Sequence, residues 1–147
     1  MGIKKEYSEL VMSGGQIRRK KVVTLTAAQI KLLNTTPITV LAAPGAGKIN
    51  IIDEIVAKNV FATAAFTGSN AMEVRYTDAS GAVAADDISS GFINTASGIG
   101  YEVSKGKSAL TPVANAVIVV RVPTANPGGA TAVGVITLSV FYRIVTP

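Results

Sequence analysis

The clearest pattern in this chain is an alternation of apolar and polar residues near its C-terminal end. Within residues 131–145, alternate apolar side chains fall on one face of an extended strand: Ile136, Leu138, Val140, Tyr142 and Ile144. A period of two residues with many β-branched types is typical of a half-buried strand. A second apolar run, residues 116–122, precedes it across a turn-rich segment. The two runs predict an antiparallel two-stranded ribbon, which needs further strands and a covering layer.

Shorter apolar runs between turn residues predict more strands in the middle of the chain. Met72, Val74 and Tyr76 alternate with Glu73 and Arg75, so we expect the apolar three to face the core and the charged two to pair outside. The runs that predict these strands are residues 38–42, 49–57, 60–66, 71–77 and 101–104. Seven or eight short strands at this spacing fit a β-sandwich or a jelly roll.

One short helix is predicted near the N-terminal end. Thr26 suits the N-cap position, and Gln29 stands three residues later to complete a capping box. Leu25 and Ile30 occupy the two positions of a hydrophobic staple. The helix must end before Pro37, because the residue that precedes a proline avoids the helical region. We expect this helix to cover one end of the sandwich.

The composition favours the same fold class. The chain has 18 Val, 14 Ile and 14 Thr but only 7 Leu, and branching at Cβ suits a sheet better than a helix. With 147 residues, one domain with a core of its own is expected. We predict an all-β protein, a β-sandwich or jelly-roll-like domain with one short capped helix near the N-terminus. Because the core side chains are small, part of the stability is expected from association with copies of the same chain.

The net charge of +5 is concentrated at the N-terminal end. Residues 1–31 carry seven basic and two acidic residues, whereas residues 32–147 carry seven of each. This asymmetry predicts a basic N-terminal arm, residues 1–21, followed by a β-sandwich domain, residues 22–147. The arm residues predicted to bind a partner are Lys4, Lys5, Arg18, Arg19, Lys20 and Lys21.

The basic run at residues 18–21 leaves three interpretations open. It could be a solvated arm that contacts other subunits, a contact with an acidic protein surface, or a nucleic-acid contact. No aromatic residue is interleaved with the run for base stacking, so nucleic acid is the least favoured partner. If the run did bind DNA, the affinity would fall steeply with salt.

No residue pattern predicts a catalytic, cofactor or metal site. The chain has no Cys and no His, which removes thiolate chemistry and the commonest general base and transition-metal ligand. The PGAGK segment at residues 44–48 is similar to a phosphate-binding loop. However, Ala42 stands where that loop needs Gly, and Ile49 replaces its hydroxyl residue. A tight turn is the simpler interpretation.

Two adjacent acid pairs are the remaining candidates for carboxylate chemistry. Neighbours in a strand point to opposite faces, so Asp53 and Glu54 are not expected to converge as a glycosidase pair would. Asp86 and Asp87 stand beside turn residues and could offer oxygens to calcium, although the EF-hand spacing is missing and a solvated turn is the default. Alternatively, Asp87 could cap one helical turn within residues 87–95. We therefore predict a protein that is not an enzyme.

No secretory signal and no membrane span are predicted. The first 20 residues contain no apolar core of a signal peptide, and no unbroken apolar run approaches 18 residues. A soluble protein made in a cytoplasm is the expectation.

Residues 23–48, VTLTAAQIKLLNTTPITVLAAPGAGK, resemble the start of a family of small structural proteins from tailed bacteriophages and prophages. Later segments are similar as well, namely residues 66–68, 74–77, 110–115 and 140–144. The resemblance extends over roughly residues 22–146 and leaves the basic arm outside it. It implies a virion protein without fixing its position in the particle.

The resemblance and the composition together give one hypothesis and two alternatives. The hypothesis is a capsid decoration or cement protein on the head, a symmetric homo-oligomer (a trimer is favoured) that binds the major capsid protein or another virion protein. It would be found in the virion, after assembly in the host bacterial cytoplasm, with no membrane partner. One alternative is a head-fibre, tail or baseplate component, and copy number per particle separates the two. The other is a carbohydrate-binding β-sandwich, which would need an exposed aromatic platform.

Overall fold

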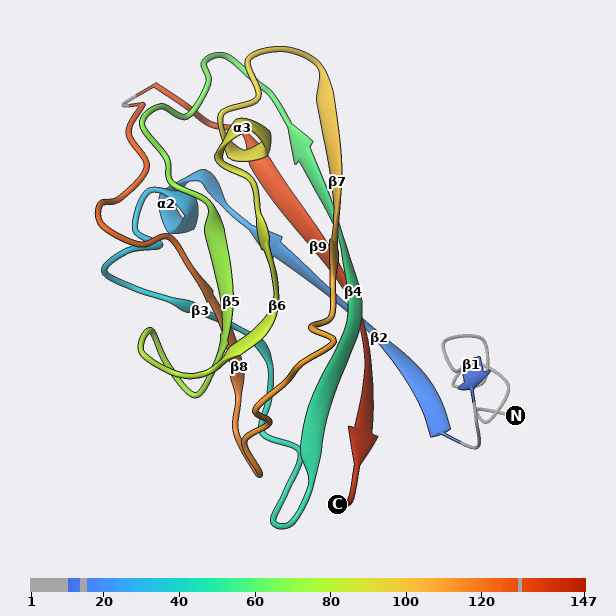
Figure 1. The fold of residues 1–147 in the computed structure, drawn as a ribbon. Helices are drawn as coiled ribbons and strands as arrows, with labels where there is room; N and C mark the ends of the chain where they lie inside the picture. Colours follow the sequence, from blue (N-terminus) through green and yellow to red (C-terminus); the bar gives the residue numbers. More distant parts are fainter. Residues whose placement is uncertain (1–10, 14–15, 130) are drawn as a thin grey trace.

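The protein is a sandwich of two antiparallel β-sheets (Figure 1). The computed structural model describes residues 11–13, 16–129 and 131–147, and side chains from residue 17 onward. The five-stranded sheet has the order β1-β2-β9-β4-β7, and the four-stranded sheet has the order β3-β8-β5-β6. The strands are β1 (Val11–Ser13), β2 (Gln16–Leu25), β3 (Ile38–Leu41), β4 (Ile49–Val60), β5 (Met72–Tyr76), β6 (Val83–Ile88), β7 (Ile99–Lys105), β8 (Ile118–Arg121) and β9 (Val135–Val145). The predicted all-β sandwich is confirmed.

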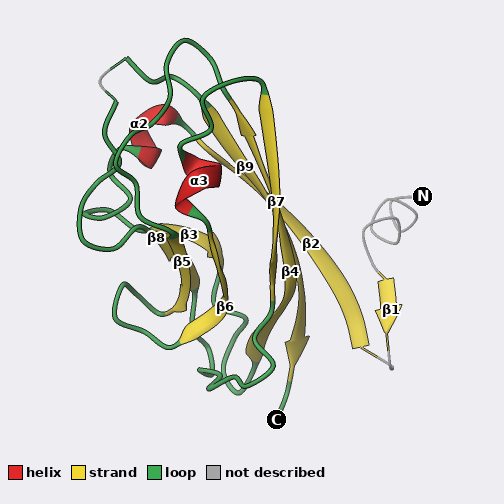
Figure 2. Ribbon diagram, turned by 45° about the horizontal axis from the view of Figure 1, so that its top comes forward, coloured by secondary structure: helices red, strands yellow, loops and turns green. Residues whose placement is uncertain are grey.

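Two short helices lie on the same side of the five-stranded sheet as the four-stranded sheet (Figure 2). The first, α2 (Ala27–Ile30), begins with the predicted capping box: the Thr26 hydroxyl accepts from the backbone N–H of Gln29, and the side-chain Oε1 of Gln29 accepts from the backbone N–H of Thr26. Ile30 is fully buried, so this helix covers part of the core. The second, α3 (Ser90–Ile93), is capped by Ser89. The assignment of its cap to Asp87 was therefore wrong, because Asp87 still belongs to β6.

The two C-terminal apolar runs do not form the predicted ribbon. β9 lies in the five-stranded sheet between β2 and β4, whereas β8 lies in the four-stranded sheet between β3 and β5. The reason is the length of the partners: β4 pairs with β9 from Ile49↔Val145 to Val60↔Val135, and β2 covers seven further positions on the other edge. A strand of four residues such as β8 is too short to bond most of the backbone N–H and C=O groups along one edge of the eleven-residue β9.

Other strand boundaries differ from those that the local sequence pattern predicted. Residues 61–66 are a loop and not the predicted strand; within it, Phe66 is buried and serves as an apolar anchor. Strand β6 was not predicted, because it is short and contains two acidic residues. Asp86 and Asp87 therefore lie in a strand and not beside a turn. The predicted boundary between residues 21 and 22 falls inside β2, so residues 16–21 continue the sheet.

Alternation along the strands builds the core as predicted. In β5, Met72, Val74 and Tyr76 are buried, and in β9 Ile136, Leu138 and Val140 are buried. All of these side chains belong to one apolar cluster between the two sheets. Glu73 and Arg75 pair on the outside of β5, as expected.

A buried tyrosine joins the two sheets by a hydrogen bond. The hydroxyl of Tyr76, on β5, donates to the backbone carbonyl of Asn50, on β4, over 2.6 Å. Burial raises the pKa of Tyr76 to about 12, because the interior disfavours the charged phenolate. The neutral hydroxyl is therefore the form that holds the sheets together at ordinary pH.

Tyr76→Phe is expected to lower the free energy of unfolding by about 1 to 2 kcal/mol, because the Asn50 carbonyl would stay buried without its donor. The measurement is urea unfolding, with Tyr101→Phe as the control on an exposed ring. The folded pKa lies above the unfolded one, so the wild-type protein gains stability from this group below about pH 10 and loses it as the pH rises toward 12. This part of the alkaline loss should be missing in Tyr76→Phe. Equal unfolding curves for Tyr76→Phe and the wild type would contradict the assignment.

Candidate functional site on the outer face of the five-stranded sheet

The basic run of the sequence is divided between the two faces of β2. In the register with β9, Lys20 lies opposite Phe141 and Lys21 lies opposite the buried Val140. Opposite residues of an antiparallel pair point to the same side. Arg18 and Lys20 therefore lie on the outer face, away from the four-stranded sheet, whereas Arg19 and Lys21 point to the inner side. The predicted arm residues Lys4 and Lys5 lie outside the described residues.

The same outer face carries exposed apolar side chains. On the edge strand β7, Ile99, Tyr101 and Val103 are 54%, 66% and 50% exposed. Val60 of β4, opposite Ile99, and Val22 of β2 are exposed as well. In the described part of the chain eight large hydrophobic side chains are exposed, and these five share one face. We call them the apolar strip.

A β-bulge brings two carboxylates to this face. Ile52 pairs with Tyr142 and Glu54 pairs with Phe141, so Asp53 is an extra residue in β4. The bulge keeps both Ile52 and Ile55 buried and leaves the two acids outside. The prediction that Asp53 and Glu54 point to opposite faces was wrong, because it assumed an unbroken strand.

Three cations from three other strands hold these two carboxylates. Arg18 of β2 and Lys105 of β7 donate to Glu54 over 2.9 and 2.8 Å. Arg143 of β9 donates to Asp53 over 2.9 Å. The Nε of Arg18 lies 3.7 Å from Asp53 but is buried without a hydrogen-bond partner. We call this set of five residues the carboxylate cluster.

The cations of the carboxylate cluster favour the charged form of Glu54. The hydrogen bond from Lys105, followed by that from Arg18, holds the pKa of Glu54 below its usual value, although burial acts in the opposite direction. Glu54 is thus ionised at neutral pH, with its charge against Arg18 and Lys105. The cluster cross-links β2, β9 and β7 to the bulge in β4.

Aromatic rings lie under the cations of this face. The guanidinium of Arg18 lies 4.7 Å from the Phe141 ring centre, and the ammonium of Lys20 lies 5.7 Å from the same ring. Farther along the sheet, the ammonium of Lys58 lies 6.0 Å from the Tyr101 ring. Such contacts are worth about 0.5–1 kcal/mol at exposed sites, so they hold these long side chains along the sheet.

The two outer faces of the sandwich differ in charge. Among the side chains that the structure describes, the outer face of the five-stranded sheet carries five cations and two acids, a net +3: Arg18, Lys20, Lys58, Lys105 and Arg143 against Asp53 and Glu54. On the four-stranded side, Arg75 and Arg121 pair with Glu73, and Lys107 pairs with Asp86. There Glu73 accepts from both Arg75 and Arg121.

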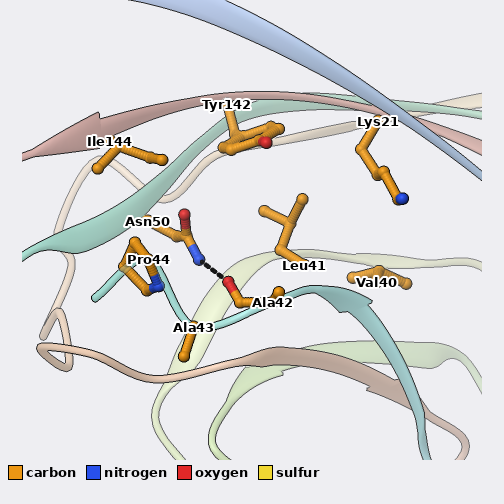
Figure 3. Close-up of a pocket in the computed structure, with 9 residues that line it drawn as sticks. All are labelled: Lys21, Val40, Leu41, Ala42, Ala43, Pro44, Asn50, Tyr142 and Ile144. Atoms are coloured by element: carbon orange, nitrogen blue, oxygen red, sulfur yellow. Dashed lines mark hydrogen bonds between the residues drawn. The ribbon is translucent and has the colours of Figure 1, made fainter.

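A pocket of about 310 Å³ opens between β2 and β3 on the other side of the five-stranded sheet (Figure 3). Lys21, Tyr142 and Asn50 supply its polar groups, and the Asn50 amide donates to the Ala42 carbonyl over 2.9 Å. Most of the remaining lining is aliphatic, from β3 and from Ile144. An amine, a phenol and an amide in this arrangement could orient a small ligand, but they form no acid–base pair.

The PGAGK segment beside this pocket is a turn, as predicted. Gly45 and Gly47 adopt positive φ angles of 108° and 70°, and the Lys48 N–H donates to the Gly45 carbonyl over 3.1 Å. A strand, β4, follows this turn, where a phosphate-binding loop would lead into a helix.

Comparisons with known proteins add no family. No protein-family model matches the chain, and no curated protein matches it in sequence. Within the described part of the chain, no three acidic side chains gather as a metal site, and no helix has the length and apolar character to cross a membrane. The resemblance to phage structural proteins therefore stays a prediction.

Gly106→Ala is expected to destabilise the bulge and the carboxylate cluster. The Gly106 N–H donates to the Asp53 carbonyl over 2.9 Å, and a Cβ on Gly106 would lie 2.0 Å from the Ile52 carbonyl oxygen. Backbone must shift to admit it, so we expect a loss of about 2 kcal/mol or more in urea unfolding. Gly91→Ala is the control, because its Cβ would meet only the Ser89 hydroxyl at 3.9 Å. Equal stability of both variants would show that the bulge tolerates a side chain.

Glu73→Gln is expected to reduce the acid sensitivity of the fold. The hydrogen bond from Arg75, with that from Arg121, lowers the pKa of Glu73 to about 2 against the effect of burial. Since the folded pKa is below the unfolded one, the stabilisation is complete above about pH 4.5 and is lost as the pH falls toward 2. The variant should be less stable by about 1 to 2 kcal/mol at pH 7, allowing for solvent screening. Urea unfolding between pH 7 and pH 2.5 tests this, and parallel curves for both proteins would refute it.

Proposed function

We propose that this protein is a non-enzymatic structural protein of a tailed-phage particle, and that it is a decoration or cement protein of the head. The observation that carries the proposal is the apolar strip on the outer face of the five-stranded sheet. Contiguous exposed apolar side chains on a soluble domain mark protein–protein contact surfaces. The sequence resemblance over residues 22–146 supplies the phage particle as the setting.

The outer face has the construction of a contact surface. Its strands are paired side by side, so the face is continuous and is supported by the core beneath it. Apolar side chains beside charged ones are the arrangement that protein interfaces use, because the apolar contacts lose water while the charges set orientation. The partner would be the major capsid protein or another virion protein.

Different observations distinguish the two alternative functions from a decoration role. A head-fibre, tail or baseplate component would be present in only a few copies per particle, whereas a decoration protein would be present in many. The carbohydrate-binding alternative needs several open aromatic rings, but on this face Phe141 lies under Arg18 and Lys20, which leaves Tyr101 by itself. Self-association as a trimer remains part of the proposal.

A double variant, Tyr101→Ser with Val103→Ser, is expected to fold normally but to lose attachment to phage heads that lack this protein. Loss of two exposed apolar contacts of the strip should reduce the amount bound by about tenfold or more. The matched control is Leu32→Ser with Ile17→Ser, which removes two exposed apolar side chains outside this face. Circular dichroism checks folding, and quantitative mass spectrometry of purified heads gives the copy number.

Two results would contradict the proposal. If both double variants bound heads as the wild type does, the apolar strip would not be the contact surface. If particles contained only a few copies of the chain, the decoration role would be wrong and a fibre, tail or baseplate role would replace it.

A further inference from the structure

The charge of the outer face is not accounted for by attachment alone. Of its five cations, three are occupied with the two carboxylates of the carboxylate cluster. Lys20 and Lys58 lie outside that cluster, on β2 and β4, and each ammonium lies over an aromatic ring of the same face. On the four-stranded side, by contrast, Arg75, Arg121 and Lys107 are each paired with an acid. The positive excess is therefore a property of one face.

The positions of these two lysines relate them to the apolar strip. Lys58 pairs with Tyr101, in the middle of the strip, and Lys20 lies two residues from Val22 on the same face of β2. A partner that covers the apolar side chains must also cover both ammonium groups. Removing an ammonium from water is costly unless an opposite charge receives it.

From these positions we propose that the surface that docks on the outer face is an acidic protein surface. Its apolar side chains would pack on Ile99, Tyr101 and Val103, and its carboxylates would meet Lys20 and Lys58. The inference rests on the proposed function in taking a virion protein as the partner. It adds that the partner's surface is acidic and that Lys20, Lys58 and the apolar strip bind it.

The available area is sufficient for a specific complex. Four strands spaced about 4.8 Å apart give a width of about 19 Å, and the eleven residues of β9 give a length of about 37 Å. The product, about 700 Å², is close to the roughly 800 Å² that each partner contributes to an ordinary protein interface.

Two other occupants fit the face less well. A second copy docked face to face would bring +3 against +3, and a double-stranded nucleic acid would bring phosphates against Asp53 and Glu54. Nucleic acid would also leave the apolar strip without a partner, because phosphate contacts dominate its binding. An acidic protein surface satisfies the cations and the apolar strip together.

The first experiment measures binding of three fluorescent probes to the full chain: a hairpin peptide of alternating Glu and Val, the same peptide with Lys for Glu, and a 20-base-pair DNA duplex. The Glu peptide should bind more tightly than the other two. For Lys20→Glu with Lys58→Glu its affinity should fall by about tenfold or more. The matched control is Lys31→Glu with Lys48→Glu, which has the same net charge but alters the end of α2 and a turn. It should stay within about twofold of the wild type.

The outcomes separate the occupants. Equal losses in both double variants would show that net charge acts without a specific face, and preference for the DNA duplex with a steep salt dependence would show a nucleic-acid surface. Either result overturns the inference. Sedimentation of the wild type that shows dimers broken by Lys20→Glu would place a second copy on this face, which also overturns it.

A second experiment separates this inference from the proposed function. Carbodiimide treatment of purified particles joins lysines to carboxylates that they touch, and mass spectrometry identifies the pairs. Links from Lys20 or Lys58 to acidic residues of another virion protein would support the inference. Links only from Lys48 or Lys107 would overturn it while leaving the chain a virion protein, and particles without the chain would overturn the proposed function by itself.

Discussion

The structure depends on the pairing of β9 with long strands on both of its edges. β2 and β4 are hydrogen-bonded to β9 along most of its length. Each paired side chain of β2 or β4 therefore points to the same side of the sheet as the β9 residue opposite it. On the inner face of β9, Ile136, Leu138 and Val140 are buried in the core. Because each sheet of a two-layer sandwich is covered on one side, everything on the opposite face of this sheet is presented to solvent or to a partner.

The bulge at Asp53 is the point at which this alternation is broken, and it decides the chemistry of the outer face. An unbroken strand would turn one of the two adjacent acids toward the apolar interior, where an ionised carboxylate is very costly. With the extra residue, Ile52 and Ile55 stay in the core and both acids stay outside. The acids then draw Arg18, Lys105 and Arg143 together from three neighbouring strands.

The basic run shows how a sheet changes the meaning of a charge pattern. As a sequence, four consecutive cations predict a solvated arm. As part of β2, alternate cations point to opposite faces of the sheet. Arg18 and Lys20 lie on the outer face over Phe141, whereas Lys21 borders the pocket on the inner side. The proposed docking surface thus combines residues from the predicted arm with residues from the predicted domain.

The sequence by itself determined the features whose causes are local: the alternation of β5 and β9, the capping box at Thr26 and the turn at residues 44–48. Only the tertiary structure decided which strands pair, where β4 bulges and which cations meet Asp53 and Glu54. Those outcomes depend on hydrogen-bond partners far apart in the chain, and period-two patterns carry no information about which partner a strand selects. The core residues could be predicted from the alternation of apolar residues, whereas the residues of the candidate site could be identified only from the pairing register of the strands.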